Sequence, residues 1–199
     1  MVMTGALHLF ANVYINIKIC FYFMNILSDI FNKSGSYGPL LLYFLSIYLL
    51  WNKQNLFFYY IIGIFVNDIS NIILKGIFLQ PRPSVDQKLF ELALKNNKRF
   101  LFKDGMPYDV LGMPSGHSQS VLFSTVFIYL ALRKKNILYV YLLISLLTMI
   151  HRVLYNHHTV LQVFIGASIG ALVGYLFYYL ATQKMKGLIR EKIDDFGPL

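Results

Sequence analysis

Apolar residues are gathered in five runs along this chain, and short polar stretches separate them. The runs occupy residues 37–51, 56–74, 118–132, 137–154 and 158–181. A helix needs about 20 apolar residues to cross the hydrocarbon core of a membrane, and these runs reach or approach that length. The pattern predicts an all-α integral membrane bundle of five to six transmembrane helices, where the sixth depends on residues 1–34.

The last of these runs carries small residues at three- and four-residue spacing. They are Gly166, Ala167, Ser168, Gly170, Ala171 and Gly174. Small side chains at this spacing let two helices approach each other closely in lipid. We therefore expect this helix to pack tightly against a neighbour.

Residues 80–117 form the longest hydrophilic stretch of the chain. Four apolar residues within it follow helical spacing and predict a short amphipathic helix on the membrane surface: Val85, Leu89, Leu92 and Ala93. Further along, Asp104-Gly105 and Met106-Pro107 predict turns.

Residues 1–34 are apolar but carry His8, Asn12 and Asn16 four positions apart, which forms one polar stripe on a helix. The stripe favours an interfacial amphipathic helix or a polar-striped membrane helix. A signal peptide is less favoured, because no basic residue precedes Lys18 and no small-residue cleavage site is evident. We divide the chain into this segment, a membrane domain at 35–182 and a basic tail at 183–199.

The composition supports a membrane protein. The chain is 57% hydrophobic and 14% charged, whereas about a quarter of the residues of a soluble domain are charged. The net charge of +9 would suggest nucleic acid on a soluble protein. On a membrane protein it indicates cytoplasmic helix ends or sites for anionic headgroups, so we expect no nucleic-acid partner. Cys20 is the single cysteine, which excludes an internal disulfide and a cysteine-based zinc site.

Ionisable and polar residues at the predicted helix ends fall into three clusters. They are Lys75 with Arg82, Ser115-Gly116-His117, and His151 with Arg152, His157 and His158. The chain leaves the membrane at Lys75, re-enters near Ser118, and returns at Arg152 after a helical hairpin. All three clusters therefore meet at one membrane face, where ionisable groups are candidates for function.

These residue types together suit phosphate chemistry. The guanidinium groups of Arg82 and Arg152 match phosphate oxygens, and Lys75 adds a point charge. Ser115-Gly116-His117 stands at a helix start, where free N–H groups favour an anion. His117 and His158 near one phosphate suggest a general acid and a nucleophile. Because the sequence holds no Asp or Glu cluster for a metal, we expect phosphoryl transfer without a metal or another cofactor.

Taken singly, each of these residues has a simpler explanation. Lys75 alone is more often a helix-end lysine that extends towards the headgroups. His117 alone would be a cap or packing residue, and the basic residues of 95–103 a solvated or headgroup-facing run. Only the convergence of the three clusters points to a site.

Residues 75–83 read KGIFLQPRP, residues 114–117 read PSGH, and residues 151–162 read HRVLYNHHTVLQ. In this order they resemble the K-x6-R-P, P-S-G-H and S-R-x5-H-x3-D motifs of the type 2 phosphatidic acid phosphatase family, which shares its site with vanadium haloperoxidases. His151 replaces the serine of the third motif, and Gln162 replaces its aspartate. The resemblance covers roughly residues 38–180 and implies the helical core of that family.

The resemblance also implies roles for these residues. His158 would attack the terminal phosphorus and form a phosphohistidine, while His117 would protonate the leaving oxygen and later activate water. Gln162 would orient His158 from the next helical turn, as a hydrogen-bond acceptor without the negative charge of aspartate. His157 is the rival nucleophile. The implied phosphate ligands are Lys75, Arg82, Ser115, Gly116 and Arg152.

Glutamine at position 162 resembles the dolichyldiphosphatase and glucose-6-phosphatase branches, and residues 112–119 are similar to the second motif of dolichyldiphosphatases. The implied function is a metal-independent membrane phosphatase for a lipid phosphate or diphosphate, with polyprenyl or dolichyl diphosphate favoured. Phosphatidate or another phosphomonoester is the alternative substrate. A non-catalytic protein that binds lipid headgroups and a vanadate-dependent haloperoxidase are the rival classes.

Flanking charge predicts the orientation of this multi-pass membrane protein. Eight Lys and Arg residues flank the helix ends away from the clusters, and five remain on the cluster side once Lys75, Arg82 and Arg152 are set aside. By the positive-inside rule, the site is expected on the lumenal or outer face.

Overall fold

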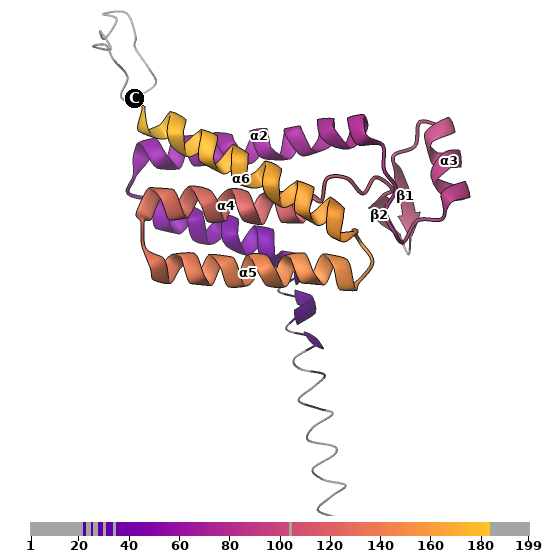
Figure 1. Ribbon diagram of the computed structural model, residues 1–199, viewed down its shortest axis with the longest axis horizontal. Helices are drawn as coiled ribbons and strands as arrows, with labels where there is room; N and C mark the ends of the chain where they lie inside the picture. The colour runs from indigo at the N-terminus through magenta and orange to yellow at the C-terminus, as the bar shows by residue number, and fades with distance from the viewer. Residues whose placement is uncertain are drawn as a thin grey trace, which may run out of the picture.

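The computed structural model describes residues 22, 25, 28, 29, 31–33, 35–103 and 105–183. Five helices of this part of the chain lie side by side in one bundle (Figure 1). They are Gly35–Leu50, α2 (Gln54–Phe78), α4 (Gly116–Leu132), α5 (Lys135–Leu154) and α6 (Val160–Thr182). At one end stand the short helix α3 (Gln87–Lys95) and a hairpin of β1 (Phe100–Lys103) and β2 (Met106–Asp109). The predicted helical bundle is confirmed.

The outer surface of the bundle is apolar, as a membrane requires. Phe65, Leu143 and Leu172 are each more than half exposed. The exposed face of a helix in a water-soluble protein carries polar side chains instead. By length and composition, α2, α5 and α6 can each cross a membrane, while Gly35–Leu50 is a shorter apolar helix. The chain is therefore an integral membrane protein.

The bundle end away from the hairpin has the residues of a membrane interface. Tyr48 and Trp51 are largely exposed there, and Lys53, Lys134 and Lys135 are exposed beside them. Aromatic rings and basic side chains prefer the boundary between hydrocarbon and water. The opposite end, which carries the hairpin, then lies at the other boundary.

The tightest helix packing joins α4 to α6, and glycine makes it possible. A Cβ atom at Gly166, Gly170 or Gly174 would lie 2.4, 1.9 or 2.6 Å from the backbone oxygens of Ser115, Gln119 and Phe123, respectively. These approaches are closer than any real Cβ contact, so the two backbones touch only because these positions lack side chains. The close approach expected from the small-residue spacing is confirmed.

The end structure has a small core of its own. Phe90 and Ala93 of α3 are buried with Val110 and Leu111, and Leu101 packs against them. The predicted amphipathic helix is present as α3, with Phe90 and Ala93 buried and Leu89 and Leu92 exposed, and its position on the membrane surface stays a prediction. The helix starts at Gln87 because Asp86 caps it, accepting hydrogen bonds from the N–H groups of Lys88 and Leu89.

The expectation of a turn at Met106-Pro107 is wrong, because both residues belong to β2. The strands pair antiparallel, with Phe102 opposite Pro107 and Lys103 opposite Met106, and the turn between them includes Gly105. Gly105 there has a φ of +77°, which glycine adopts without strain. An Asp-Gly pair between two apolar stretches is a hairpin signal that would have predicted these strands.

Several expectations concern residues outside the described ones. The stripe of His8, Asn12 and Asn16 lies there, and so does the basic tail from residue 184 onwards. The division of the chain at 34 and 182 stays a prediction.

Candidate active site

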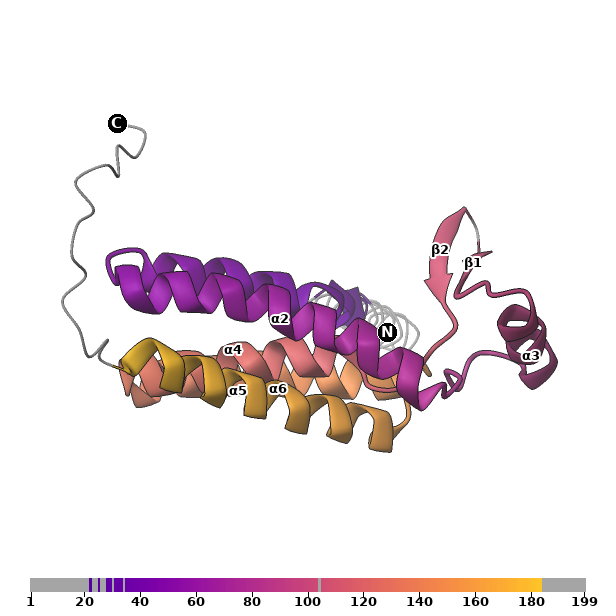
Figure 2. The ribbon, with the colours of Figure 1, turned by 90° about the horizontal axis from the view of Figure 1, so that it is seen from above.

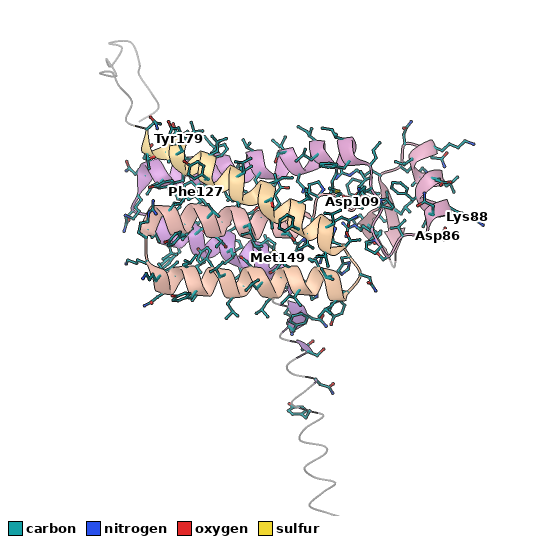
Figure 3. All side chains as sticks on the ribbon, viewed as in Figure 1. Asp86, Lys88, Asp109, Phe127, Met149 and Tyr179 are labelled. Atoms are coloured by element: carbon teal, nitrogen blue, oxygen red, sulfur yellow. The ribbon has the colours of Figure 1, made fainter. Side chains whose placement is uncertain are left out.

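The three clusters found in the sequence lie at the same end of the bundle. The C-terminal ends of α2 and α5 and the N-terminal ends of α4 and α6 meet beside the hairpin (Figure 1). Figure 3 labels Asp109 where β2 returns to the bundle. The structure thus brings the segments of Lys75, His117 and Arg152 together, as the helix count requires.

The loop after α2 and the segment before α4 are paired through their backbones. The N–H of Gly112 donates to the carbonyl of Gln80 at 2.7 Å, and the N–H of Arg82 donates to the carbonyl of Val110 at 3.1 Å. A third bond, from the N–H of Ser115 to the carbonyl of Gln162 at 3.1 Å, ties this segment to α6. These bonds join the loop after α2, the segment before α4 and the start of α6.

His158 is held in one orientation. Its side chain is buried, and Nδ1 lies 2.8 Å from the carbonyl oxygen of Gly112. A carbonyl can only accept, so Nδ1 carries the proton and the lone pair of the neutral ring is on Nε2. Its backbone N–H donates to the carbonyl of Arg152 at 3.1 Å, which fixes the loop between α5 and α6.

The electrostatic surroundings keep this ring neutral. Burial first, and then the positive charges of Arg82, Arg152 and Lys75, lower the pKa of His158. These are the same three cations that the sequence analysis expected to bind phosphate, and each acts on this ring. A neutral imidazole with a free lone pair is the form that can act as a nucleophile.

Gln162 contacts the site in a way that the sequence did not predict. Its Nε2 donates to the carbonyl of Pro81 at 3.0 Å, and its Oε1 accepts from the N–H of Thr159 at 3.2 Å. The expected hydrogen bond from His158 to Gln162 is therefore replaced by the bond to Gly112. A Cβ atom on Gly112 would lie 2.7 Å from the Gln162 amide. The Gln162 amide thus packs against Gly112, whose carbonyl orients His158.

Arg82 and Arg152 both have a donor without a partner. The Nε atoms of these two side chains are buried and have no hydrogen bond among the described residues. Burial lowers the pKa of Arg82, and its guanidinium lies 5.0 Å from the centre of the Tyr108 ring. Buried donors left unpaired are costly to a fold, so this pair is suited to an anion that binds between them.

Lys75 is engaged by a carboxylate that the sequence analysis did not single out. Its Nζ lies 2.6 Å from Oδ2 of Asp109 and donates to the carbonyl of Leu111 at 3.1 Å. Arg99 binds the same carboxylate, with NH2 3.1 Å from Oδ2. Burial alone would raise the pKa of Asp109, but the hydrogen bonds from Arg99 and Lys75 outweigh it and hold the pKa below its usual range. No local motif marks Asp109, because its partners are distant in sequence.

The start of α4 is set by a buried amide network. Gln119 donates to the carbonyl of Asn67 at 2.8 Å, and its Oε1 accepts from Asn71 at 2.8 Å. Asn71 also donates to the carbonyl of Pro114 at 3.3 Å. These bonds attach the segment before Ser115 to α2, and the N-terminus of α4 then presents the N–H groups of Gly116 and the next residues.

His117 borders a cavity beside the site. Its Nε2 lies 3.2 Å from the carbonyl oxygen of Ser36, so this nitrogen carries a proton. The cavity has a volume of about 390 Å³ and opens between Gly35–Leu50, α2 and α4. Its lining includes Leu40, Asp68, Ile72 and Ser120. The cavity offers space next to His117 for a group that leaves the site.

His157, the rival nucleophile, has different surroundings. The centre of its ring lies 6.1 Å from the centre of the His151 ring. The His151 ring in turn lies 4.5 Å from the Tyr155 ring, centre to centre, and its Nε2 lies 3.3 Å from Oδ1 of Asn32. Burial, with the charges of Arg152 and Arg82, lowers the pKa of His157 to about 4.

Among the described residues, no three His, Cys, Asp or Glu side chains gather as a metal ion would need.

Comparison with known proteins agrees with the motifs. A family model described as the PAP2 superfamily matches residues 55–186, which include all three motifs. The chain belongs to this superfamily. The resemblance to the type 2 phosphatidic acid phosphatases is thereby confirmed.

Among curated proteins, a dolichyldiphosphatase of Saccharomyces cerevisiae is similar to this chain. The two are 31% identical over 139 residues, which cover 65% of this chain and 51% of the yeast protein. The chain therefore spans about half the length of this relative. No solved structure matches the chain.

Proposed function

We propose that this protein is a membrane phosphatase that hydrolyses a lipid phosphate or diphosphate, with polyprenyl or dolichyl diphosphate as the favoured substrate. One observation carries the proposal: the buried His158 has its lone pair on Nε2, and Arg82 and Arg152, whose charges act on this ring, each have a buried Nε donor with no partner among the described residues. Membership of the PAP2 superfamily and the similarity to a dolichyldiphosphatase support it.

The first chemical step forms a phosphohistidine. Nε2 of His158 attacks the terminal phosphorus, and the bond from phosphorus to the leaving oxygen breaks as the phosphorus–nitrogen bond forms. His117 enters this step as an imidazolium and donates its Nδ1 proton to the leaving oxygen, while Nε2 keeps its hydrogen bond to the carbonyl of Ser36. Arg82, Arg152 and the N–H groups at the start of α4 bind the phosphoryl oxygens and stabilise the charge of the transition state.

The second step releases phosphate. His117, now lacking that proton, accepts one from a water molecule, which attacks the phosphorus as the bond to His158 breaks. The products are inorganic phosphate and the dephosphorylated lipid, and both histidines return to their starting forms. The Gly112 carbonyl keeps the proton of His158 on Nδ1 during this cycle, and the Gln162 amide packs against Gly112.

A lipid substrate is favoured by the position of the site. Lys75 is near the end of the membrane helix α2, and His158 precedes the membrane helix α6, so the phosphate-binding residues lie close to the headgroup level. The cavity beside His117 lies on the leaving-group side in this mechanism and has Leu40 and Ile72 in its lining. A prenyl chain attached to the leaving group could remain in the bilayer.

The test compares His158→Ala with His157→Ala in purified protein. Phosphate release from dolichyl diphosphate, phosphatidate and glucose 6-phosphate is measured with and without a metal chelator. We expect the first variant to lose at least 10³-fold in rate, the second to retain most activity, and chelator to have no effect. Full activity of His158→Ala would overturn the assignment, and wild-type lipid binding without turnover with all three substrates would indicate a binding protein.

We also propose that the site faces the lumen or the outside of the cell. The support is charge, because Lys53, Lys134 and Lys135 are exposed at the opposite end. In a Cys20→Ser background, Lys98→Cys should react with a membrane-impermeant maleimide added to intact cells. Lys53→Cys should react only after permeabilisation, and the reverse result would contradict this orientation.

A further inference from the structure

Strand β1 has one face that nothing in the described part of the chain covers. Phe100 and Phe102 are 54% and 78% exposed, while Leu101 between them packs into the small core of the end structure. Side chains alternate across a strand, so both phenylalanines point away from that core. Two exposed aromatic rings on one face of a strand indicate a surface that contacts another molecule.

The position of the hairpin suggests what covers this face. Figure 2 shows the hairpin beyond the ends of the helices, with its strands running across the direction of the helices. Because α2, α5 and α6 are long enough to span a membrane, their ends mark its boundary. The hairpin, which stands beyond these ends, therefore lies at the level of the membrane surface.

The charges around this face match a headgroup layer. Lys88, Lys95 and Lys98 are exposed on and after α3, and the guanidinium of Arg99 lies 5.4 Å from the centre of the Phe100 ring. Aromatic rings beside basic side chains are typical of protein surfaces that lie in the interface of anionic membranes. A water-exposed loop would gain nothing from the two phenylalanines.

We propose that β1 is a bilayer anchor. Phe100 and Phe102 insert at the boundary of headgroups and acyl chains, and the surrounding lysines contact anionic headgroups. The anchor is connected to the site, because its partner strand β2 ends at Asp109, which binds Lys75. The contact would hold the end structure, and with it the segment before α4, at the depth where a lipid phosphate lies.

The main test uses fluorescence and does not depend on activity. Trp51 is the sole tryptophan, so Trp51→Phe with Phe102→Trp places one reporter on the anchor. The protein is reconstituted into phosphatidylcholine vesicles containing phosphatidylglycerol, with or without brominated acyl chains. Trp51→Phe with Glu91→Trp, on the exposed surface of α3, is the matched control.

We expect the reporter of Phe102→Trp to have blue-shifted emission, strong quenching by brominated lipid and weak quenching by iodide. The reporter of the Glu91→Trp control should be quenched by iodide instead. Quenching of the Phe102→Trp reporter by iodide but not by lipid would overturn the proposal. Shielding from both quenchers would indicate a protein partner and would overturn it too.

A kinetic test links the anchor to the proposed function, on which this arm rests. Phe100→Ser with Phe102→Ser should raise KM several-fold for a lipid diphosphate in vesicles and leave kcat/KM unchanged for a water-soluble phosphate ester. An equal loss with both substrates would contradict an anchoring role. If the wild type turned over neither substrate, the proposed function would fail, while the fluorescence test would still decide the anchor.

Discussion

The contact between α4 and α6 makes a sharp prediction about Gly170. In Gly170→Ala, the new Cβ atom would lie 1.9 Å from the carbonyl oxygen of Gln119, which is backbone and cannot rotate away. A separation of at least 3.0 Å is needed, so the helices must move apart by about 1 Å. Gly76→Ala is the control, because no atom lies within 4 Å of a Cβ atom there.

Two contributions of opposite sign decide the stability of Gly170→Ala. Alanine is better than glycine in a helix by about 1 kcal/mol, whereas overpacking costs about 1–3 kcal/mol. Because the clash at Gly170 is with backbone, we take the upper value and expect a net loss of about 2 kcal/mol there. For a chain of this size, 1 kcal/mol corresponds to about 2–4 °C. Gly170→Ala should therefore lower Tm by roughly 4–8 °C, and Gly76→Ala should raise it slightly.

The assay is thermal unfolding of both variants in the same detergent, followed by circular dichroism. Phosphatase activity is measured in parallel, because the hydrogen bond from Ser115 to the carbonyl of Gln162 joins the starts of the same two helices. Gly170→Ala should lose activity as well as stability. If both variants changed Tm by the same amount, the close approach of α4 and α6 would be refuted.

Four further predictions concern the site. Asp109→Asn removes the negative charge beside Lys75, so inhibition by inorganic phosphate should become tighter, and weaker inhibition would contradict this reasoning. The pKa of Asp109 is lowered in the fold, so its ionised form stabilises the protein at pH values above the usual aspartate pKa. This stability is lost as the pH falls from the usual aspartate pKa towards the lower pKa of the folded state. Between about pH 5 and pH 3, Tm of the wild type should therefore drop more than Tm of Asp109→Asn. Arg152→Lys keeps the charge but removes Nε and the planar fork, and vanadate inhibition should weaken by about tenfold or more, whereas unchanged inhibition would exclude Arg152 as an oxyanion ligand. Gln162→Met removes the donor to Pro81 at similar volume, and a loss of about 1–3 kcal/mol in stability with a lower kcat is expected from unfolding and steady-state assays.

Sequence alone predicted the helices and the meeting of the three clusters, because both follow from apolar run length and from the number of membrane crossings. It also predicted the close approach at Gly166, Gly170 and Gly174, since only small residues recur at that spacing on α6. These features depend on residue type at fixed intervals, which a sequence displays directly.

The parts that sequence did not predict depend on backbone atoms and distant partners. The carbonyl of Gly112 orients His158, but a carbonyl has no residue-specific signature. Asp109 binds Lys75 across 34 positions of the chain, and no periodic pattern connects them. The role of Gln162 was expected from its i+4 spacing to His158, whereas the fold directs its amide to Pro81 instead.

Because a backbone carbonyl rather than a carboxylate orients His158, the protein places no negative charge beside this ring at the Gly112 contact. A carboxylate would stabilise the imidazolium form, whereas the Gly112 carbonyl fixes the tautomer without adding an opposite charge. Burial and the charges of Arg82 and Arg152 then keep the pKa of the ring low, so its resting form is neutral. In the proposed mechanism, the negative charge that accompanies phosphohistidine formation is that of the phosphate itself, bound between the same two arginines. Glutamine in place of the family aspartate is therefore compatible with catalysis, because the substrate supplies the counter-charge that the protein leaves out.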